Sequence, residues 1–366
     1  MSPDGTSSKY GRPRVRDDIA LRAGYHSPQL DVSVRLNTNE APSAPPAEFG
    51  VALHSALDEI DWHRYPDRSA RALRAALAQR YGRAFEEVFV ANGSNEVLQT
   101  IMLTFGGAGR TAAVFEPTYA LHAHISKTTG TAVVEGARRE DFSLDLDEVR
   151  RVIETHAPDV VFLCSPNNPT GVVDPPDTVD SVLDLMSETN GLLVVDEAYG
   201  QFSETSAVDK VANDVPLVVS RTFSKTWSMA GARLGYLLAP AWIVEELDKV
   251  VLPYHLDSFK QAAGLAALSF GEAMDERVAL IVEERTRLLA ALESLPVTKW
   301  DSGANFFLFR ANDMSGDEVW NRLVEESVLV RNCSSWPRLH DCLRVTIGTP
   351  EENDLFLGAL STVLAR

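Results

Sequence analysis

Short apolar runs alternate with helical patterns through the middle of the chain. Six of these runs lack the alternation of a half-exposed strand, which is typical of parallel strands that are covered on both faces. They are Thr111–Phe115, Thr131–Glu135, Val160–Cys164, Leu192–Val195, Leu217–Ser220 and Leu234–Ala239. Apolar residues at helical spacing occur at Arg68–Tyr81, Glu96–Phe105, Leu146–His156 and Asp177–Glu188. This rhythm predicts an α/β domain with a doubly wound, mostly parallel sheet.

The pattern changes after about residue 250. A long helical stretch at Glu272–Leu295 precedes four short strand patterns and two helical ones. These are Val297–Trp300, Asn305–Arg310, Gly316–Glu326, Val328–Val330, Leu343–Ile347 and Pro350–Leu364. Residues 1–30 are polar and rich in Gly, Pro and Arg. We therefore expect an N-terminal arm over 1–45, a large domain over 46–250 and a smaller α+β domain over 251–366.

Composition and charge exclude several classes of function. The chain has 366 residues and 34 basic against 52 acidic side chains, a formal charge of −18. Such an acidic chain is a poor ligand for nucleic acid or anionic membranes, and no apolar run approaches the ~20 residues of a membrane span. Its three cysteines have no metal spacing, no metal is expected, and no secretory signal is visible, so we expect a cytoplasmic protein. The tryptophans Trp227, Trp242, Trp300, Trp320 and Trp336 are interpreted as packing residues.

A lysine follows one of the predicted strands. Lys225 stands in the segment SRTFSKTWSMAGARLGY, just beyond the run that ends at Ser220. Ligands of open α/β sheets bind at the carboxyl ends of the strands. Burial by Phe223 and Trp227 would lower the pKa of Lys225 and make its amine nucleophilic. Taken alone, the pattern fits a surface lysine in a loop about equally well.

Three other motifs occupy similar positions. Asp196 ends the strand LLVVD and is costly to bury unless it meets a cation, although a helix cap or a salt bridge would also explain it. Asn168 stands in SPNNPTG, which could be a plain turn. Ser94 in ANGSNE begins a helix whose free N–H groups can bind phosphate, or simply caps that helix.

These four motifs occur in a fixed order: GSNE, SPNNPTG, DEAY, and SK with an arginine eight residues later. In this order they resemble the fold-type-I pyridoxal-phosphate aminotransferases. Further segments, LNTNE, HRYPD, LPYHL, ANFFLF and CLRVTIGTPEEND, are similar to the histidinol-phosphate aminotransferases of that fold. The resemblance covers most of the chain. It implies a large doubly wound domain and a smaller C-terminal domain, pyridoxal 5′-phosphate as cofactor, and a homodimer with shared active sites.

The resemblance also implies roles for named residues. Lys225 would hold the cofactor covalently and later move a proton, and Asp196 would pair with the pyridine nitrogen. Asn168 and Tyr199 would hydrogen-bond the phenolic oxygen, and Tyr119 would stack on the ring. The cofactor phosphate would be bound by Ser94, Asn95, Thr222, Ser224 and Arg233, with Tyr65 of HRYPD reaching it from the neighbouring subunit.

Two arginines would bind the substrate. The resemblance implies that Arg344 holds the anionic group beside the reacting carbon, with Arg331 and Tyr25 helping when that group is a phosphate, and it places Asn39 nearby. The implied reaction is transamination of L-histidinol phosphate with 2-oxoglutarate, giving imidazole-acetol phosphate and glutamate. Asn95, Asn332 and the segment APSAPP depart from the usual family pattern.

Two other enzyme activities stay open at the sequence level. An aromatic amino-acid aminotransferase would need a similar pocket, because a phenyl ring and an imidazole differ little in size. A decarboxylase of a phosphorylated amino acid uses the same scaffold. A transcriptional regulator built on this fold is not expected, because residues 1–45 are too short and polar to form a DNA-binding helix-turn-helix.

Overall fold

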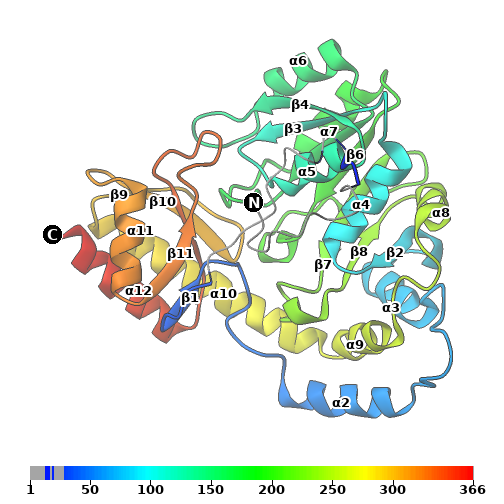
Figure 1. Cartoon of the computed structure of the whole chain (residues 1–366), viewed down its shortest axis with the longest axis horizontal. Coiled ribbons are helices and arrows are strands. Elements are labelled where there is room, and N and C mark those ends of the chain that lie inside the picture. Colours follow the sequence, from blue (N-terminus) through cyan, green and yellow to red (C-terminus); the bar gives the residue numbers. More distant parts are fainter. Residues whose placement is uncertain (1–12, 17–18, 20–28, 366) are drawn as a thin grey trace, which may run out of the picture.

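The computed structural model describes residues 13–16, 19 and 29–365. Two sheets, each with its own helices, form a large and a small unit (Figure 1). The large sheet has the strand order β2-β8-β7-β6-β5-β3-β4, and the small one has the order β1-β11-β12-β10-β9. Among the described residues, no helix has the length and apolar character needed to span a membrane. The doubly wound, fold-type-I architecture predicted from the sequence is confirmed.

Six of the seven strands of the large sheet are almost entirely buried, whereas the edge strand β4 has only Gly136 buried. The seven strands are β2 (Val88–Ala91), β3 (Thr111–Glu116), β4 (Ala132–Ala137), β5 (Val160–Cys164), β6 (Leu192–Asp196), β7 (Leu217–Thr222) and β8 (Gly235–Leu238). The apolar run of β8 suggested a parallel strand, but β8 pairs antiparallel with both β7 and β2. The connection from β7 to β8 contains a single 3₁₀ turn and no α-helix, whereas parallel crossovers usually contain an α-helix. Strand β2, which the sequence analysis missed, consequently runs in the same direction as β7.

Helices cover both faces of this sheet. They are α3 (Arg71–Tyr81), α4 (Ser94–Phe105), α5 (Leu121–Thr128), α6 (Leu146–His156), α7 (Thr178–Met186) and α8 (Ala241–Val250). Helix α6 shows why they form: the Asp145 carboxylate caps its first turn, and Val149, Val152 and Ile153 lie buried on one face. Single 3₁₀ turns occur at Phe85–Glu87, Gly200–Phe202, Val208–Lys210, Ala230–Ala232 and Leu292–Ser294.

The small unit contains a strand from the N-terminal region. Its sheet consists of β1 (Val34–Leu36), β9 (Val297–Lys299), β10 (Phe306–Ala311), β11 (Val328–Asn332) and β12 (Leu343–Thr346). Helices α11 (Gly316–Glu325) and α12 (Pro350–Leu364) pack against it. Strand β1 pairs in parallel with β11, and its Val34 and Leu36 side chains are buried in the small core. The range 1–45, expected to be an arm, therefore contributes a strand to this unit.

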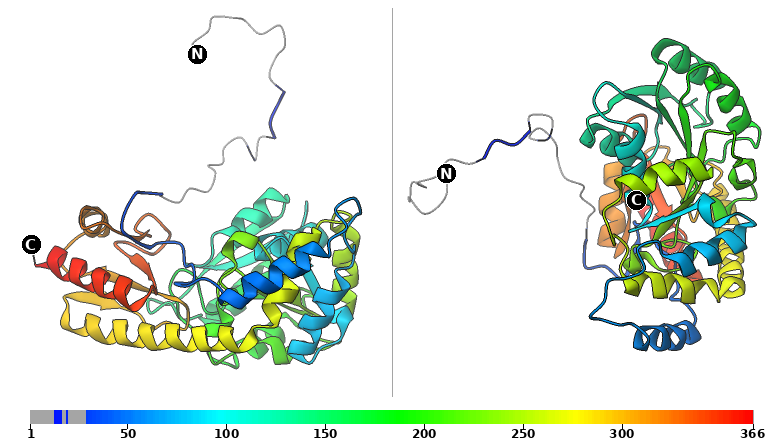
Figure 2. Two further views of the ribbon diagram at one scale, coloured as in Figure 1. Left: turned by 90° about the horizontal axis from the view of Figure 1, so that it is seen from below. Right: turned by 90° about the vertical axis from the view of Figure 1, so that its right-hand side faces the viewer.

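Helix α10 (Gly271–Ala291) connects the two units (Figure 2). Met274 near its start belongs to the large core, whereas Ile281 and Leu288 belong to the small one. Helix α9 (Ser258–Leu268) packs against α3 and against α2 (Ala47–Asp58), which buries no residue of its own. The structure thus changes from one unit to the other within α10, later in the chain than the boundary expected at residue 250.

Candidate active site

The carboxyl ends of β2, β3, β5, β6 and β7 lie at one edge of the large sheet, because these strands run in the same direction. Each is followed by one of the residues that the sequence analysis singled out. Contacts from the N-terminal segment and from the small sheet reach the same edge. The site is therefore assembled from both units.

Lys225 follows β7 directly. Its Nζ donates a hydrogen bond to the carbonyl oxygen of Thr38 at 3.1 Å and lies 5.7 Å from the centre of the Tyr199 ring. Burial and the guanidinium groups of Arg344 and Arg233 lower the pKa of Lys225 to about 7, although Glu40 opposes them. About half of its amines are neutral near pH 7, so Lys225 can act as a nucleophile or as a proton carrier.

Asp196 ends β6 and is almost fully buried at 1% exposure. Its Oδ2 lies 3.0 Å from Nε2 of His122, and its Oδ1 accepts a hydrogen bond from the Ala198 amide at 3.1 Å. The His122 ring is stacked on Phe162, with ring centres 4.8 Å apart and planes 6° apart. The sequence analysis did not single out His122. Its position three residues after Tyr119 was the available signal.

Hydrogen-bond donors gather where helix α4 begins. Arg233 donates to Ser224 Oγ at 3.2 Å, and the Ser224 amide donates to Thr222 Oγ1 at 3.1 Å. Gly93 precedes the helix with a φ of 84°, and a Cβ atom there would lie 3.0 Å from Nη2 of Arg233. Arg233 therefore lies against the start of α4, where the first amides, including that of Ser94, have no carbonyl within the helix to bind. This set of donors suits a phosphate group.

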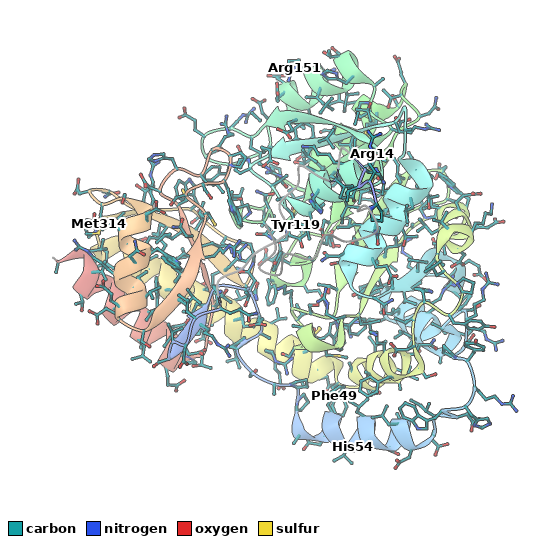
Figure 3. The ribbon with its side chains drawn as sticks, viewed as in Figure 1. Arg14, Phe49, His54, Tyr119, Arg151 and Met314 are labelled. Carbon is teal, nitrogen blue, oxygen red and sulfur yellow. The ribbon has the colours of Figure 1, made fainter. Side chains whose placement is uncertain are left out.

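Tyr119 contacts the start of α4, whereas Asn168 contacts the small sheet. The Tyr119 hydroxyl donates to Asn95 Oδ1 at 3.2 Å, which links the residue after β3 to the start of α4. Figure 3 shows Tyr119 near the middle of the molecule, on the side of the large unit that faces the small one. Asn168, between β5 and α7, accepts a 2.6 Å hydrogen bond from Arg344 at Oδ1.

Arg331 and Arg344 come from neighbouring strands of the small sheet. Their Cα atoms are direct partners in the antiparallel pair of β11 and β12, and both side chains are buried, with exposures of 8% and 7%. Arg344 also donates to the Asn37 carbonyl at 3.1 Å and lies over the Phe306 ring, 5.2 Å from its centre. Side chains of direct cross-strand partners share one face of a sheet, so two cations face the same side.

The segment 37–39 contacts three site residues in succession. Besides the contacts of Asn37 with Arg344 and of Thr38 with Lys225, Asn39 Nδ2 donates to the Tyr199 hydroxyl at 3.0 Å. Asn39 has a φ of 55° and is 1% exposed. Burial raises the pKa of Tyr199 to about 12, so its hydroxyl stays protonated and can donate a hydrogen bond. The segment is thus a structural part of the site.

Among the described residues, one predicted site residue has no contact with this site in its own chain. Tyr65 is 80% exposed and stacks on Tyr254, with ring centres 4.5 Å apart. Its hydroxyl makes no hydrogen bond to any described residue of its own chain. Tyr25 lies outside the residues that the structure describes.

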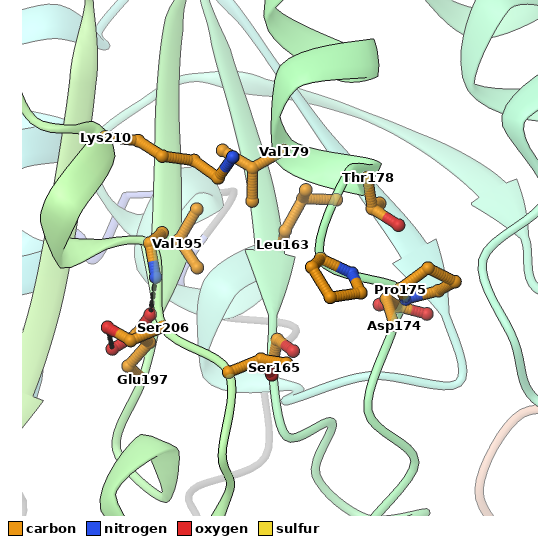
Figure 4. Close-up of a pocket in the computed structure, with 13 residues that line it drawn as sticks. Leu163, Ser165, Asp174, Pro175, Thr178, Val179, Val195, Glu197, Ser206 and Lys210 are labelled. Carbon is orange, nitrogen blue, oxygen red and sulfur yellow. Dashed lines mark hydrogen bonds between the residues drawn. The ribbon is translucent and has the colours of Figure 1, made fainter.

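A separate small cavity lies near the ends of β5 and β6 (Figure 4). Its lining includes Ser165, Thr178, Glu197 and Lys210, and its volume of about 30 Å³ suits one or two water molecules. Lys225 and Asp196 do not line it, so it is distinct from the candidate site. In the described part of the chain, no group of three His, Cys, Asp or Glu side chains could hold a metal ion.

Comparison with known proteins identifies related chains. Residues 32–360 match the model of the aminotransferase class I and II family. A protein of Frankia casuarinae named histidinol-phosphate aminotransferase is 42% identical over 96% of this chain and 90% of its own. A protein of the same name from Streptomyces avermitilis is 43% identical over 94% of this chain and 95% of its own.

Solved structures share the fold. The structure of histidinol-phosphate aminotransferase from Sinorhizobium meliloti in complex with pyridoxal-5′-phosphate has a TM-score of 0.88 and 23% identity, and the match covers 97% of this chain and 98% of that one. Aspartate aminotransferase from Thermus thermophilus with maleate has a TM-score of 0.80 and 25% identity, covering 91% of this chain and 92% of that one. At these identities the likeness establishes the arrangement of the elements.

Proposed function

We propose that this chain, which belongs to the aminotransferase class I and II family, transfers the amino group of L-histidinol phosphate to 2-oxoglutarate with pyridoxal 5′-phosphate as cofactor. The products would be imidazole-acetol phosphate and glutamate, a step of histidine biosynthesis. The chain is an aminotransferase, and relatives about 42% identical over nearly its whole length are named for histidinol phosphate. The observation that carries the substrate proposal is the buried pair of Arg331 and Arg344.

The described residues fit the cofactor. A phosphate needs clustered donors, and the Ser94 amide, the Thr222 and Ser224 hydroxyls and the Arg233 guanidinium supply them. Asn95 belongs to the same first helical turn. A protonated pyridine nitrogen needs a buried carboxylate, which Asp196 provides. Lys225, with its lowered pKa, suits covalent attachment of an aldehyde.

When bound, pyridoxal phosphate supplies an electron sink that stabilises negative charge on the Cα atom of the amino substrate. The negative charge of Asp196 would keep the pyridine nitrogen protonated. Asn168 and Tyr199 would donate hydrogen bonds to the phenolic oxygen, and Tyr119 would cover the ring face. Lys225 Nζ would take the proton from the substrate Cα, because a neutral amine with a pKa of about 7 is suited to general base catalysis.

Arg344 would bind the anionic group next to the reacting carbon. This group is the carboxylate of glutamate in one half-reaction and the phosphate of histidinol phosphate in the other. Arg331 would supply a second guanidinium for the doubly charged phosphate, and Asn39 would keep the Tyr199 hydroxyl in place. In a chain of charge −18, such a local pair of cations selects a strongly anionic substrate.

The enzyme would be a homodimer, and each of its two active sites would contain residues of both subunits. Tyr65 is exposed and makes no hydrogen bond to the Ser94–Arg233 donors of its own chain, so we propose that it reaches the phosphate of the other subunit. The proposed localisation is the cytoplasm, where the soluble substrates of amino-acid biosynthesis are found.

The test is an assay of purified, cofactor-loaded enzyme with histidinol phosphate and with phenylalanine as amino donors and 2-oxoglutarate as acceptor. We expect kcat/KM to be roughly 10- to 100-fold higher for histidinol phosphate, since one extra charge-assisted contact contributes about 1.5–3 kcal/mol. A preference for phenylalanine would instead indicate an aromatic amino-acid aminotransferase. Release of carbon dioxide from a phosphorylated amino acid would indicate a decarboxylase.

A further inference from the structure

The connection between β11 and β12 folds into a closed loop beside the two arginines. Its ends are joined by the Cys333 amide, which donates to the Cys342 carbonyl at 3.0 Å. Inside the loop, the Trp336 amide donates to the Cys333 carbonyl at 2.9 Å, and the Leu339 amide donates to the Trp336 carbonyl at 3.1 Å. Arg331 lies two residues before this closure and Arg344 two residues after it. The loop is therefore directly joined to both substrate arginines.

Trp336 folds back from this loop over Arg331. The Cζ atom of Arg331 lies 5.2 Å from the centre of the Trp336 ring, a cation–π contact. The ring also packs against a buried cluster formed by Phe142, Leu308, Cys333, Leu339 and Cys342, with Trp300 alongside. Packing in this cluster fixes the Trp336 ring, and the ring in turn restricts the orientation of the Arg331 guanidinium. Because a guanidinium over an aromatic face keeps its N–H groups in its own plane, this contact leaves them able to bind an anion.

The loop is anchored on the large unit. Arg338 Nη2 donates to the carbonyl oxygen of Arg138 at 2.9 Å. Arg138 itself forms a buried two-point ion pair with Asp174, with N–O distances of 2.9 and 3.0 Å. The position of the Trp336 ring is thus fixed relative to the unit that carries Lys225, although Arg331 and Trp336 belong to the small unit.

Contacts restrict the guanidinium groups of both arginines. Arg344 is held by hydrogen bonds to Asn168 Oδ1 and the Asn37 carbonyl, which use one N–H of each terminal nitrogen. The guanidinium of Arg331 lies over the ring of Trp336, and this contact restricts the plane of the guanidinium.

We propose that Trp336 is a positioning residue that holds Arg331 for the phosphate group of the amino donor and thereby sets the preference for phosphorylated over carboxylate donors. This proposal rests on the proposed function of Arg331. It assigns to Trp336 a role beyond the packing that the sequence suggested. A substrate without a phosphate, such as glutamate, needs Arg344 alone and should be insensitive to Trp336.

The experiment compares three substitutions in the cofactor-loaded enzyme. Trp336→Leu fills part of the space without a ring, and Trp336→Phe keeps an aromatic face. Trp300→Phe is the matched control, because Trp300 belongs to the same cluster but contacts Arg310 rather than Arg331. For each variant, kcat and KM are measured with histidinol phosphate and with glutamate, and inorganic phosphate is titrated as a competitive inhibitor.

We expect Trp336→Leu to raise both the KM for histidinol phosphate and the inhibition constant of inorganic phosphate about fivefold, within the range of roughly 2- to 30-fold that such contacts support. The kcat and the KM for glutamate should stay within about twofold. Trp336→Phe should recover most of the loss, and Trp300→Phe should resemble the wild type. Trp336→Met replaces the leucine variant if that variant has no cooperative thermal transition.

Two results would overturn the inference: an unchanged inhibition constant for inorganic phosphate in Trp336→Leu, or equal losses with both amino donors. A wild-type enzyme that rejects histidinol phosphate would contradict the proposed function instead. Even then, the titration with inorganic phosphate would still show whether Trp336 positions Arg331 for a phosphate.

Discussion

Asp196 and His122 form a buried pair in which carboxylate and imidazole atoms lie 3.0 Å apart. The Phe162 ring stacks on the imidazole and restricts its position, so the imidazole can orient the carboxylate. A hydrogen bond to a charged group is worth about 1.5–3 kcal/mol. The hydrogen bond therefore fixes the orientation of the Asp196 carboxylate at its buried position at the end of β6.

Removing each member of this pair should have a different effect. We expect Asp196→Asn to slow the single-turnover half-reaction by roughly 10³-fold or more, because a buried charge that pairs with a cation is lost. His122→Phe keeps the stacking on Phe162 but loses the hydrogen bond, and should lower kcat/KM by roughly 10- to 100-fold. Thermal melting of both variants provides the control for folding. If His122→Phe stays within twofold of the wild type, the imidazole has no part in orienting Asp196.

The lowered pKa of Lys225 predicts how its reactivity depends on pH. Cofactor-free protein is treated with pyridoxal phosphate and borohydride, and the labelled peptides are mapped. Labelling of Lys225 should rise through pH 7 and level off above about pH 8, because the amine is then neutral. Lys249, whose pKa is raised by its hydrogen bond to Glu246, should label more slowly and keep rising into the alkaline range. A Lys225 profile that follows that of Lys249 would contradict the assignment.

The same shift affects folding. In the cofactor-free protein the pKa of Lys225 is below its ordinary value of 10.5, so the unfolded chain binds more protons between about pH 7 and 10.5. The free energy of unfolding should therefore gain a contribution from Lys225 as the pH rises through this window. Comparison with Lys225→Met, which lacks the ionisable group, isolates that contribution.

Sequence patterns singled out several of the candidate site residues because these residues end or follow a strand, which is a local feature. Lys225 after β7 and Asp196 at the end of β6 are examples. Local patterns could not show which strand ends meet, since this depends on the strand order in the sheet. The contact of His122 with Asp196, 74 positions apart, is a consequence of that order. The same limit explains why β1 was expected in an arm: its partner β11 lies almost 300 residues away.

Substitution of the two arginines should separate the two amino donors. We expect Arg331→Ala to lower kcat/KM for histidinol phosphate by roughly 10- to 100-fold and for glutamate by no more than about threefold. Arg344→Ala should impair both donors, since either anionic group needs it. Arg310→Ala is the control, because Arg310 also lies over a tryptophan ring but is exposed on the neighbouring strand. Equal losses with both donors in Arg331→Ala would favour an aromatic amino-acid aminotransferase.

Gly235, which lies against the start of α4, should be essential for binding of the cofactor phosphate. A Cβ atom at Gly235 would lie 2.3 Å from the Ser94 amide nitrogen, so Gly235→Ala must push the first helical turn away. Overpacking of this kind costs about 1–3 kcal/mol. We expect weaker binding of pyridoxal phosphate, measured by its absorbance, and a lower melting temperature without cofactor. Gly231→Ala is the matched control, because a Cβ atom there has no neighbour within 4 Å. Equal affinities in the two variants would contradict this role.

The last prediction concerns Tyr65, whose exposed ring lies against Tyr254. If Tyr65 completes the site of a second subunit, the enzyme is an obligate homodimer with two symmetric sites. A mixed dimer can test this, with Lys225→Ala in one subunit and Tyr65→Phe in the other. A shared site would place both lesions in one active site and leave the other intact. The mixed dimer should then show about half of the wild-type activity, while the Lys225→Ala homodimer is inactive and the Tyr65→Phe homodimer is impaired.

The alternative arrangement predicts a different activity for the mixed dimer. If Tyr65 acts within its own subunit, one site of the mixed dimer lacks Lys225 and the other lacks the Tyr65 hydroxyl. The activity would then be only half that of the Tyr65→Phe homodimer. The two cases can be distinguished as long as Tyr65→Phe itself lowers activity severalfold, which the homodimer measures directly. Loss of a charge-assisted hydrogen bond to a phosphate, at about 1.5–3 kcal/mol, predicts a reduction of roughly tenfold or more.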